Sequence, residues 1–177
     1  PPGDRGLPCV TAEKFHLVTR ERPKRLEGVT FDRNGDMYFT SNYEGRVYKL
    51  DMRTMERVCV WQDETLRPAS VKPHRDGRLI ISCLSGSRSG RIVVARPDGS
   101  TERTLAEGRD VDDVVFDADG NMYYTHFTGT VYNPVGAIYR VTPDFEHEEV
   151  FIPNLCSPNG ICFSPDYSVL WITEFTA

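Results

Sequence analysis

The chain has 177 residues, of which 39% are hydrophobic and 27% are charged, and its formal net charge is -5 at pH 7. This length and composition fit one ordinary domain with a hydrophobic core and exclude a disordered chain. The acidic balance and the scattered Lys and Arg residues argue against nucleic acid and anionic membrane surfaces as partners.

Membrane-spanning and disulfide-stapled proteins are also disfavoured. No apolar run reaches the roughly 20 residues that a transmembrane helix needs. The cysteines are odd in number and show no zinc-binding spacing, and they are Cys9, Cys59, Cys83, Cys156 and Cys162. We therefore expect free, mostly buried thiols in a reducing compartment, which predicts a cytoplasmic location.

Four short turn sequences recur along the chain, and a β-rich run follows each of them. The turns are DRNG at 32–35, HRDG at 74–77, DADG at 117–120 and SPDY at 164–167, and the runs are MYFTS, RLIIS, NMYYT and VLWIT. Further strand candidates lie between these markers, namely GRVYKLD, ERVCVW, GRIVVARPD, TERTLA, GAIYRVTPD and EEVFI. Units of about four strands that repeat at intervals in the forties are typical of β-propeller blades.

The repeat predicts an all-β fold in which residues 1–177 form the N-terminal part of one β-propeller domain. Three units are complete and the fourth stops after its second strand, so the chain covers about three and a half blades. Since propellers close with about four to eight blades, we expect the remaining blades, on the same polypeptide or on a second fragment, to be partners. The β-prone segment 13–21 is expected to pair, in a closed ring, with the last blade, which residues 1–177 lack.

The repeat also brings three polar residues into the same phase. A phenylalanine opens the turn in the first, third and fourth units, and the residue four positions before it is Glu27, Asp112 or Asn159. The second unit has Ala69 at this position. Equivalent positions of a propeller lie at equivalent heights around its central channel, so we expect the three side chains to converge.

Carboxylate and amide oxygens without His or Cys form a hard ligand set that suits Ca²⁺, with Mg²⁺, Mn²⁺ or Zn²⁺ as alternatives. The competing interpretation is that Pro-Asn-Gly at 158–160 is only a tight turn between strands. Adjacent residues of a strand point to opposite faces, which favours Asp112 over Asp113 as the direct ligand. Asp113 is expected to support the site instead.

At these residues the sequence resembles the gluconolactonase, senescence-marker and luciferin-regenerating family of six-bladed propellers, and most closely its drug-responsive lactonase branch. The motifs that carry the resemblance are EGVTFDRNGDMYFTSNYEGRVYKLD, HRDGRL, DVDDVVFDADGNMYYTHFTG, NPVGAIYRVTPDF and PNGICFSPDYSVLWITE. They occur in the family's order and cover nearly the whole chain from about Leu26 onward.

The resemblance implies a Ca²⁺-dependent hydrolase of small-molecule lactones, in which Glu27, Asp112 and Asn159 hold the metal. The family's catalytic aspartate, which is also the fourth metal ligand, is expected in the next blade, beyond Ala177. Two other functions stay open. One is a related metal-dependent esterase or phosphotriesterase, and the other is a non-enzymatic propeller scaffold that binds another polypeptide.

Four smaller expectations follow. His126 stands where the lactonase branch usually has Asp, a change that is either neutral or retunes the pocket. A second, structural Ca²⁺ is an option near the Ser-x-Gly element at Ser87–Gly90. Tyr123, Tyr124 and Phe127 are candidates for lining a substrate pocket, although aromatic residues of an inner strand are more often in the core, and Trp61 and Trp171 are expected in the core by default. No long amphipathic helix is expected.

Overall fold

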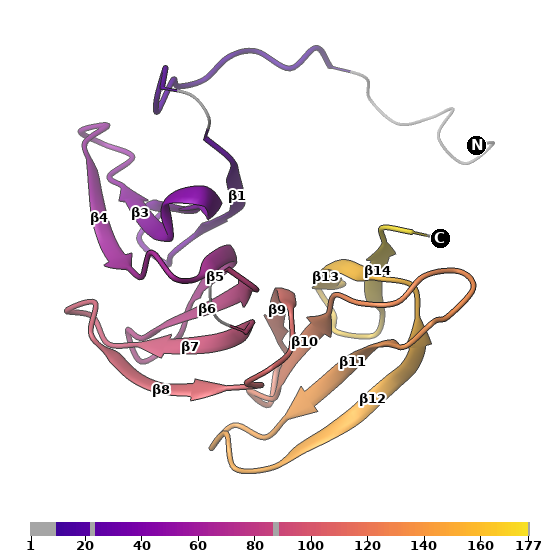
Figure 1. The fold of residues 1–177 in the computed structure, drawn as a ribbon. Coiled ribbons are helices and arrows are strands. Elements are labelled where there is room, and N and C mark those ends of the chain that lie inside the picture. Colours follow the sequence, from indigo (N-terminus) through magenta and orange to yellow (C-terminus); the bar gives the residue numbers. More distant parts are fainter. Residues whose placement is uncertain (1–9, 22–23, 87–88, 177) are drawn as a thin grey trace.

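A computed structural model describes residues 10–21, 24–86 and 89–176 of the protein, and these residues form antiparallel sheets arranged in an arc (Figure 1). Three sheets have four strands and the fourth has two. A single 3-10 turn, Asn42–Glu44, is the helical structure within the described residues. The all-β prediction is confirmed.

Within each sheet the strands follow one another in chain order. The first sheet contains β1 (Leu26–Phe31), β2 (Met37–Ser41), β3 (Arg46–Leu50) and β4 (Arg57–Gln62). The second contains β5 (Arg67–Pro73), β6 (Leu79–Leu84), β7 (Arg91–Ala95) and β8 (Thr101–Leu105). The third contains β9 (Val111–Phe116), β10 (Met122–His126), β11 (Gly136–Val141) and β12 (Glu148–Leu155), and the fourth contains β13 (Pro158–Phe163) and β14 (Leu170–Glu174).

The four recurring turns close the hairpins between the first and second strands of the four sheets. Gly35, Gly77 and Gly120 have φ values of 85°, 92° and 89°, a region in which glycine is not strained. Tyr167 takes the equivalent place in the fourth turn with φ 58°. Directly before and after these turns, four pairs lie opposite each other, namely Phe31 with Met37, Pro73 with Leu79, Phe116 with Met122 and Phe163 with Leu170. The repeat and its phase are therefore real structural equivalences.

The hydrophobic core lies between neighbouring sheets. Val47, Trp61 and Val71 belong to a cluster that joins the first two sheets, and Ile80 and Val114 belong to one that joins the second and third. Strand β6 faces a neighbour on both sides, because Leu79 and Ile81 contact one cluster while Ile80 contacts the other. Its sequence LIIS therefore lacks the polar alternation of a strand with one solvated face.

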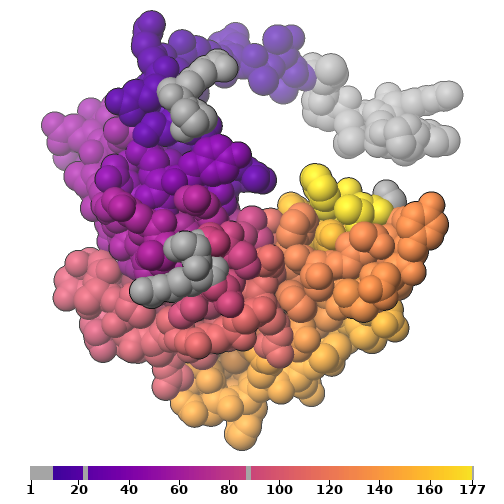
Figure 2. Space-filling model, in the orientation of Figure 1, coloured from indigo at the N-terminus to yellow at the C-terminus, as the bar shows by residue number. Residues whose placement is uncertain are grey.

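The fourth sheet is less covered, and one core prediction is wrong there. Trp61 is buried as expected, with 4% exposure, whereas Trp171 on β14 is 63% exposed. Leu170 and Ile172 pack against the third sheet, and no sheet of the described chain packs on the opposite face of the fourth sheet, where Trp171 lies. Figure 2 shows the hollow that separates the first sheet, in indigo and purple, from the yellow end of the chain.

Segment 13–21 forms no strand in this structure, and its pairing with the last blade of a closed ring stays a prediction. One further prediction fails in the described residues. The thiols are free as expected, but they are not mostly buried, since Cys83 is buried, Cys156 is half-buried, and Cys59 and Cys162 are exposed. The two exposed cysteines lie on strands with one open face, and Cys9 lies outside the described residues.

No helix among the described residues is long and apolar enough to cross a lipid bilayer.

Candidate metal site

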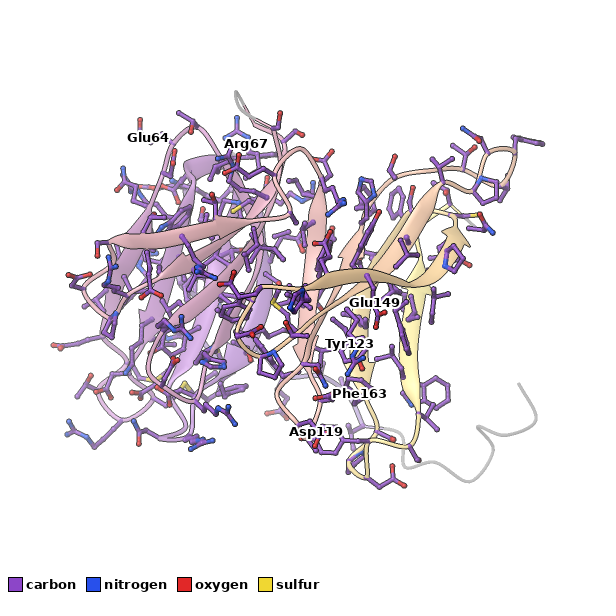
Figure 3. The ribbon with its side chains drawn as sticks, turned by 90° about the horizontal axis from the view of Figure 1, so that it is seen from below. Glu64, Arg67, Asp119, Tyr123, Glu149 and Phe163 are labelled. Carbon is purple, nitrogen blue, oxygen red and sulfur yellow. The ribbon has the colours of Figure 1, made fainter. Side chains whose placement is uncertain are left out.

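The three candidate ligands lie on the inner strands of three sheets. Glu27 is on β1, Asp112 on β9 and Asn159 on β13, and Ala69 holds the equivalent position on β5. These four strands neighbour one another in the order β1, β5, β9, β13 along the inside of the arc (Figure 1). In the side view, Glu64 and Arg67 lie on one face of the arc, and Asp119, in the third turn, lies on the opposite face (Figure 3). Since Arg67 begins β5, the candidate positions lie towards the face that carries Arg67.

Each inner strand carries a bulge at the candidate position or, on β1, directly after it, because Glu27 still pairs with Thr40. The pairing register shifts between Glu27 and Thr30 on β1, and between Pro158 and Ile161 on β13. On β9 the shift encloses Asp112 and Asp113, and on β5 it encloses Ala69. A bulge leaves one residue unpaired and redirects its side chain, so these positions are suited to presenting a ligand. Asn159 and Gly160 lie within strand β13, and the tight-turn interpretation of Pro-Asn-Gly is therefore wrong.

The bulge on β1 requires a glycine. Gly28 has φ 56°, and a Cβ atom built there would lie 2.5 Å from the carbonyl oxygen of Ala69 and 2.5 Å from Cα of Ser70. Any side chain would push β1 away from β5. The close backbone approach beside Glu27 thus depends on this residue.

A hydroxyl recurs on the second strand of each sheet and supports the bulge in three of them, which sequence reasoning missed. Thr125 Oγ1 accepts the backbone N–H of Asp113 at 3.0 Å, and Thr173 Oγ1 accepts that of Gly160 at 2.9 Å. Ser82 Oγ accepts the N–H of Ser70 at 2.9 Å. The signal was present in the sequence, because MYFT, LIIS, MYYT and LWIT all end in Thr or Ser at the same phase.

Two of these hydroxyls also reach the next sheet. Ser82 Oγ donates to the backbone carbonyl of Asp112 at 2.5 Å, and Thr40 Oγ1 donates to that of Ala69 at 3.4 Å. Both side chains are fully buried. A buried hydroxyl that satisfies groups on two sheets fixes the spacing between neighbouring candidate positions.

Asp112 has the electrostatic environment of a cation ligand. Its side chain is half-buried, and its carboxylate has no hydrogen bond or ion pair with any residue the structure describes. Burial, together with the negative charges of Asp113 and Glu27, raises the pKa of Asp112 to about 6 against the opposing effect of Arg25. A carboxylate held without a partner beside two others is stabilised by a bound cation.

The other two candidates differ in their partners. Glu27 Oε1 accepts a hydrogen bond from Arg25 Nε at 2.6 Å, so this arginine occupies part of its carboxylate. The Asn159 side chain is half-buried and makes no hydrogen bond among the described residues. Glu27 and Asp112 lie within electrostatic range of each other. No group of three His, Cys, Asp or Glu side chains in the described chain is arranged for a metal, and the candidate set contains only two carboxylates.

The Asp113 carboxylate contacts three inner strands. Its Oδ1 lies 3.0 Å from Lys72 Nζ on β5 and accepts the Val114 N–H of its own strand at 2.9 Å. Its Oδ2 accepts the Ile161 N–H of β13 at 3.3 Å. The carboxylate next to Asp112 therefore holds β5, β9 and β13 together, two residues from Asn159.

Two further sequence expectations concern His126 and the second calcium site near Ser87. His126 packs against the ring of Tyr139 with centroids 6.2 Å apart, and burial lowers its pKa. Ser87, named with the second calcium site, lies outside the described residues. Close by, the Asp110 carboxylate accepts the backbone N–H of Ser85 at 2.5 Å.

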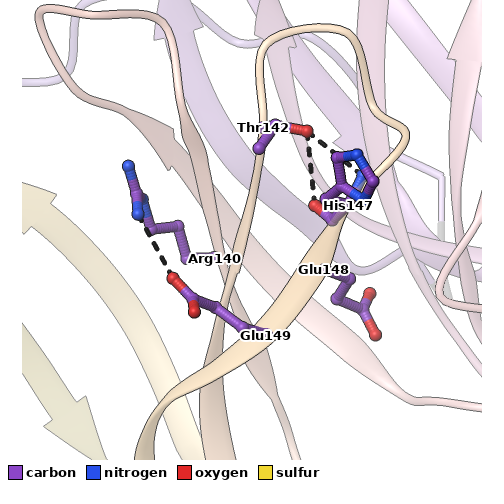
Figure 4. A pocket seen from close by; sticks show the side chains of 5 residues that line it. All are labelled: Arg140, Thr142, His147, Glu148 and Glu149. Atoms are coloured by element: carbon purple, nitrogen blue, oxygen red, sulfur yellow. Dashed lines mark hydrogen bonds and ion pairs between the residues drawn. The ribbon is translucent and has the colours of Figure 1, made fainter.

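A cavity of about 290 Å³ lies on the outer strands of the third sheet, between β11 and β12 (Figure 4). Its walls include Arg140 and Glu149, which pair at 3.2 Å, and Thr142, whose hydroxyl accepts the His147 N–H at 3.1 Å. These polar groups bind one another across the strand pair. The cavity is formed by different strands from those that carry the candidate ligands.

Comparison with known proteins bears on the fold and the family. Residues 26–177 match the family model described as the SMP-30/gluconolactonase/LRE-like region. The chain is 38% identical over 176 residues to the lactonase drp35 of Staphylococcus aureus strain MRSA252, which covers 97% of the chain and 54% of that protein. The lactonase drp35 of Staphylococcus epidermidis is 34% identical over 175 residues, with 96% and 54% covered. The chain thus spans about half the length of the curated relatives it matches.

Solved structures support the same architecture. A gluconolactonase from Xanthomonas campestris superimposes with a TM-score of 0.71 at 18% identity, covering 86% of this chain and 55% of that one. The calcium-binding protein regucalcin from Agrobacterium tumefaciens gives a TM-score of 0.62 at 19% identity, covering 84% and 50%. At such identities the likeness concerns the fold, which is part of a β-propeller. The chain belongs to the SMP-30/gluconolactonase/LRE-like family.

Proposed function

We propose that the protein hydrolyses small-molecule lactones with the help of a divalent cation, Ca²⁺ in the first place, held by Glu27, Asp112 and Asn159. The observation that carries this proposal is the half-buried Asp112 carboxylate, which has no partner among the described residues and whose pKa burial and nearby carboxylates raise to about 6. The lactonase names of the relatives that share 34–38% identity support the reaction class.

The residues present fit such an ion. Two carboxylates and one amide supply hard oxygen donors, which suits Ca²⁺ and leaves Mg²⁺, Mn²⁺ and Zn²⁺ as alternatives. Arg25 holds Oε1 of Glu27, which leaves Oε2 of this carboxylate for the ion. Asp113 would act indirectly, because its bonds to Lys72 and to the Ile161 N–H hold the strands that carry Asp112 and Asn159.

When bound, the cation would polarise the lactone carbonyl and orient a water molecule for attack. The chain's own part is to keep the oxygen donors on inner strands whose spacing is fixed by buried hydroxyls such as Ser82. Ring opening by water needs no covalent protein nucleophile. The aspartate that moves the proton is expected in the blade that follows β14 in a complete ring.

Further blades are part of this proposal. The chain covers 54% of its lactonase relatives, and β14 is paired on one side only. An unpaired strand edge is prone to aggregate unless another strand covers it. We propose that the remaining blades, on the same polypeptide or a second one, pair with β14. A cytoplasmic location is also proposed, supported by four free cysteines in the described chain.

The exposed β14 edge and Trp171 favour one second candidate, a scaffold that binds another polypeptide without catalysis. A metal-dependent esterase or phosphotriesterase would use the same ion and differ only in its substrate.

Chelation tests the proposal. The complete protein should hydrolyse a simple γ- or δ-lactone, lose this activity in excess chelator and recover it when Ca²⁺ is added. Glu27→Gln should require more Ca²⁺ for recovery, because it removes one negative charge from the ion's ligands. Asp98→Asn is the matched control, since Asp98 lies in an outer turn and bonds only to its own turn residue Ser100. Full turnover in chelator would contradict a metal-dependent reaction.

A further inference from the structure

We propose that the face of the arc that carries the recurring turns, opposite the candidate metal site, binds a small organic anion. Its carboxylate or phosphate lies between Arg33 and Arg75. Two cavities of about 240 and 260 Å³ meet at the second turn, and both are lined by Arg33, Pro73, His74 and Arg75. We call the two together the turn groove. Its walls come from all four sheets, because Phe31, Phe116 and Tyr167 also contribute.

The two arginines differ from the other cations of the sheets. Within residues 24–86 and 89–176, every other Lys and Arg makes an ion pair or a hydrogen bond in the structure. Arg33 and Arg75 make neither with any described residue, and both side chains are exposed. They occupy the same place in consecutive turns, directly after Asp32 and His74. Two free guanidinium groups that line one groove are suited to an anion with two or more oxygens.

The two acids that line the groove, Asp32 and Asp117, already have hydrogen-bond partners. Asp32 accepts the backbone N–H groups of Asn34 and Asp36 at 2.8 and 3.0 Å, and its second oxygen lies 3.5 Å from Lys49 Nζ. Asp117 accepts from the Asn121 side chain at 2.7 Å. The second turn has His74 where the first and third have these aspartates, which removes one negative charge from the middle of the groove. Both carboxylates that line the groove, Asp32 and Asp117, therefore already have partners.

Aromatic walls suggest that the anion carries a flat or apolar part. The His74 ring packs against Phe116 with centroids 5.2 Å apart and lies beside both cavities. Phe31 and Tyr167 line opposite halves of the groove and are 54% and 49% exposed. Each half is smaller than the roughly 300 Å³ at which pockets for drug-sized ligands begin. A compact aromatic or short-chain anion fits this space and chemistry.

Calorimetric titration of the full chain with benzoate and with inorganic phosphate tests the proposal. The first probe offers a carboxylate with a ring and the second offers charge alone, so the two distinguish the kinds of ligand. Arg33→Gln and Arg75→Gln should each weaken binding of at least one probe by up to about fivefold, the upper end of the range expected for exposed charge pairs. Arg53→Gln is the control, because Arg53 is an exposed turn arginine outside the groove.

Binding that falls in both groove variants and stays unchanged in Arg53→Gln would support the site. Absence of binding by either probe at about 10 mM, a concentration that detects even weak binding, would overturn it. An equal loss in all three variants would overturn it as well, because it would reflect the net charge of the protein. No readout uses lactone hydrolysis, so the result is independent of the proposed enzymatic function.

Discussion

Replacing Asp112 by Asn should change how the stability of the metal-free protein depends on pH. The pKa of this carboxyl is raised from 3.8 to about 6, so the folded state holds its proton more tightly than the unfolded chain does. The resulting stabilisation is fully present below the unfolded pKa of 3.8 and is lost as pH rises through about 6. Asparagine does not titrate, and the variant should lack this loss.

The size of the effect follows from the shift. At about 1.36 kcal/mol per pKa unit the full contribution is about 3 kcal/mol, of which about 2 kcal/mol falls between about pH 4.5 and about pH 7.5. Urea unfolding in the presence of chelator would measure the free energy of unfolding of both proteins across this range. The wild-type value should fall relative to that of Asp112→Asn by about 2 kcal/mol as pH rises.

Two controls make the measurement specific. Asp98→Asn should run parallel to the wild type over this range, because the pKa of Asp98 is lowered by its hydrogen bonds to Ser100 and this carboxyl titrates at more acid pH. Added Ca²⁺ at about pH 7.5 should stabilise the wild type more than Asp112→Asn. Parallel pH profiles for the wild type and Asp112→Asn would refute the claim that Asp112 is held as an unpartnered, partly buried acid.

Three substitutions test the packing around the site, each by urea unfolding. Gly28→Ala should cost well over the roughly 1–2 kcal/mol of a positive φ alone, because its Cβ would meet the Ala69 carbonyl oxygen, whereas Gly108→Ala, also at positive φ but with open space, should cost only about that amount. Equal costs would contradict the close approach. Ser82→Ala should cost about 1–3 kcal/mol, since it leaves buried backbone groups unsatisfied, and a neutral result would remove the hydroxyl's role. Ile80→Ala should cost about 2–5 kcal/mol while the exposed Val58→Ala stays within about 0.5 kcal/mol, and similar costs would contradict the assigned core.

The strand repeat could be predicted because each blade carries its own local signals. Turn sequences with Gly35, Gly77 and Gly120 are followed by runs whose β-branched and aromatic residues form strands. The phase of Glu27, Asp112 and Asn159 followed from the same turns. What the sequence did not reveal is the bulge at or directly beside each of these positions, because a bulge depends on pairing between two strands.

The burial of side chains was predicted less well, because it too depends on contacts between distant parts of the chain. Trp61 and Trp171 both follow an apolar residue on a strand at the edge of a sheet, but Trp61 faces the core cluster that joins the first two sheets, whereas no described sheet packs on the face that carries Trp171. Cys59 and Cys162 were misjudged in the same way. The supporting hydroxyl of Ser82 was visible as a repeated Thr or Ser, but its bond to the next sheet depends on how the blades pack.

The central claim is that Glu27, Asp112 and Asn159 together hold a divalent cation. A crystal structure of the complete protein grown with Ca²⁺ tests it most directly. We predict an ion with an oxygen of each of the three side chains at roughly 2.3–2.6 Å, the usual range for calcium. A structure in which the three side chains lie far apart, or in which calcium binds elsewhere and leaves Asp112 without it, would contradict the account.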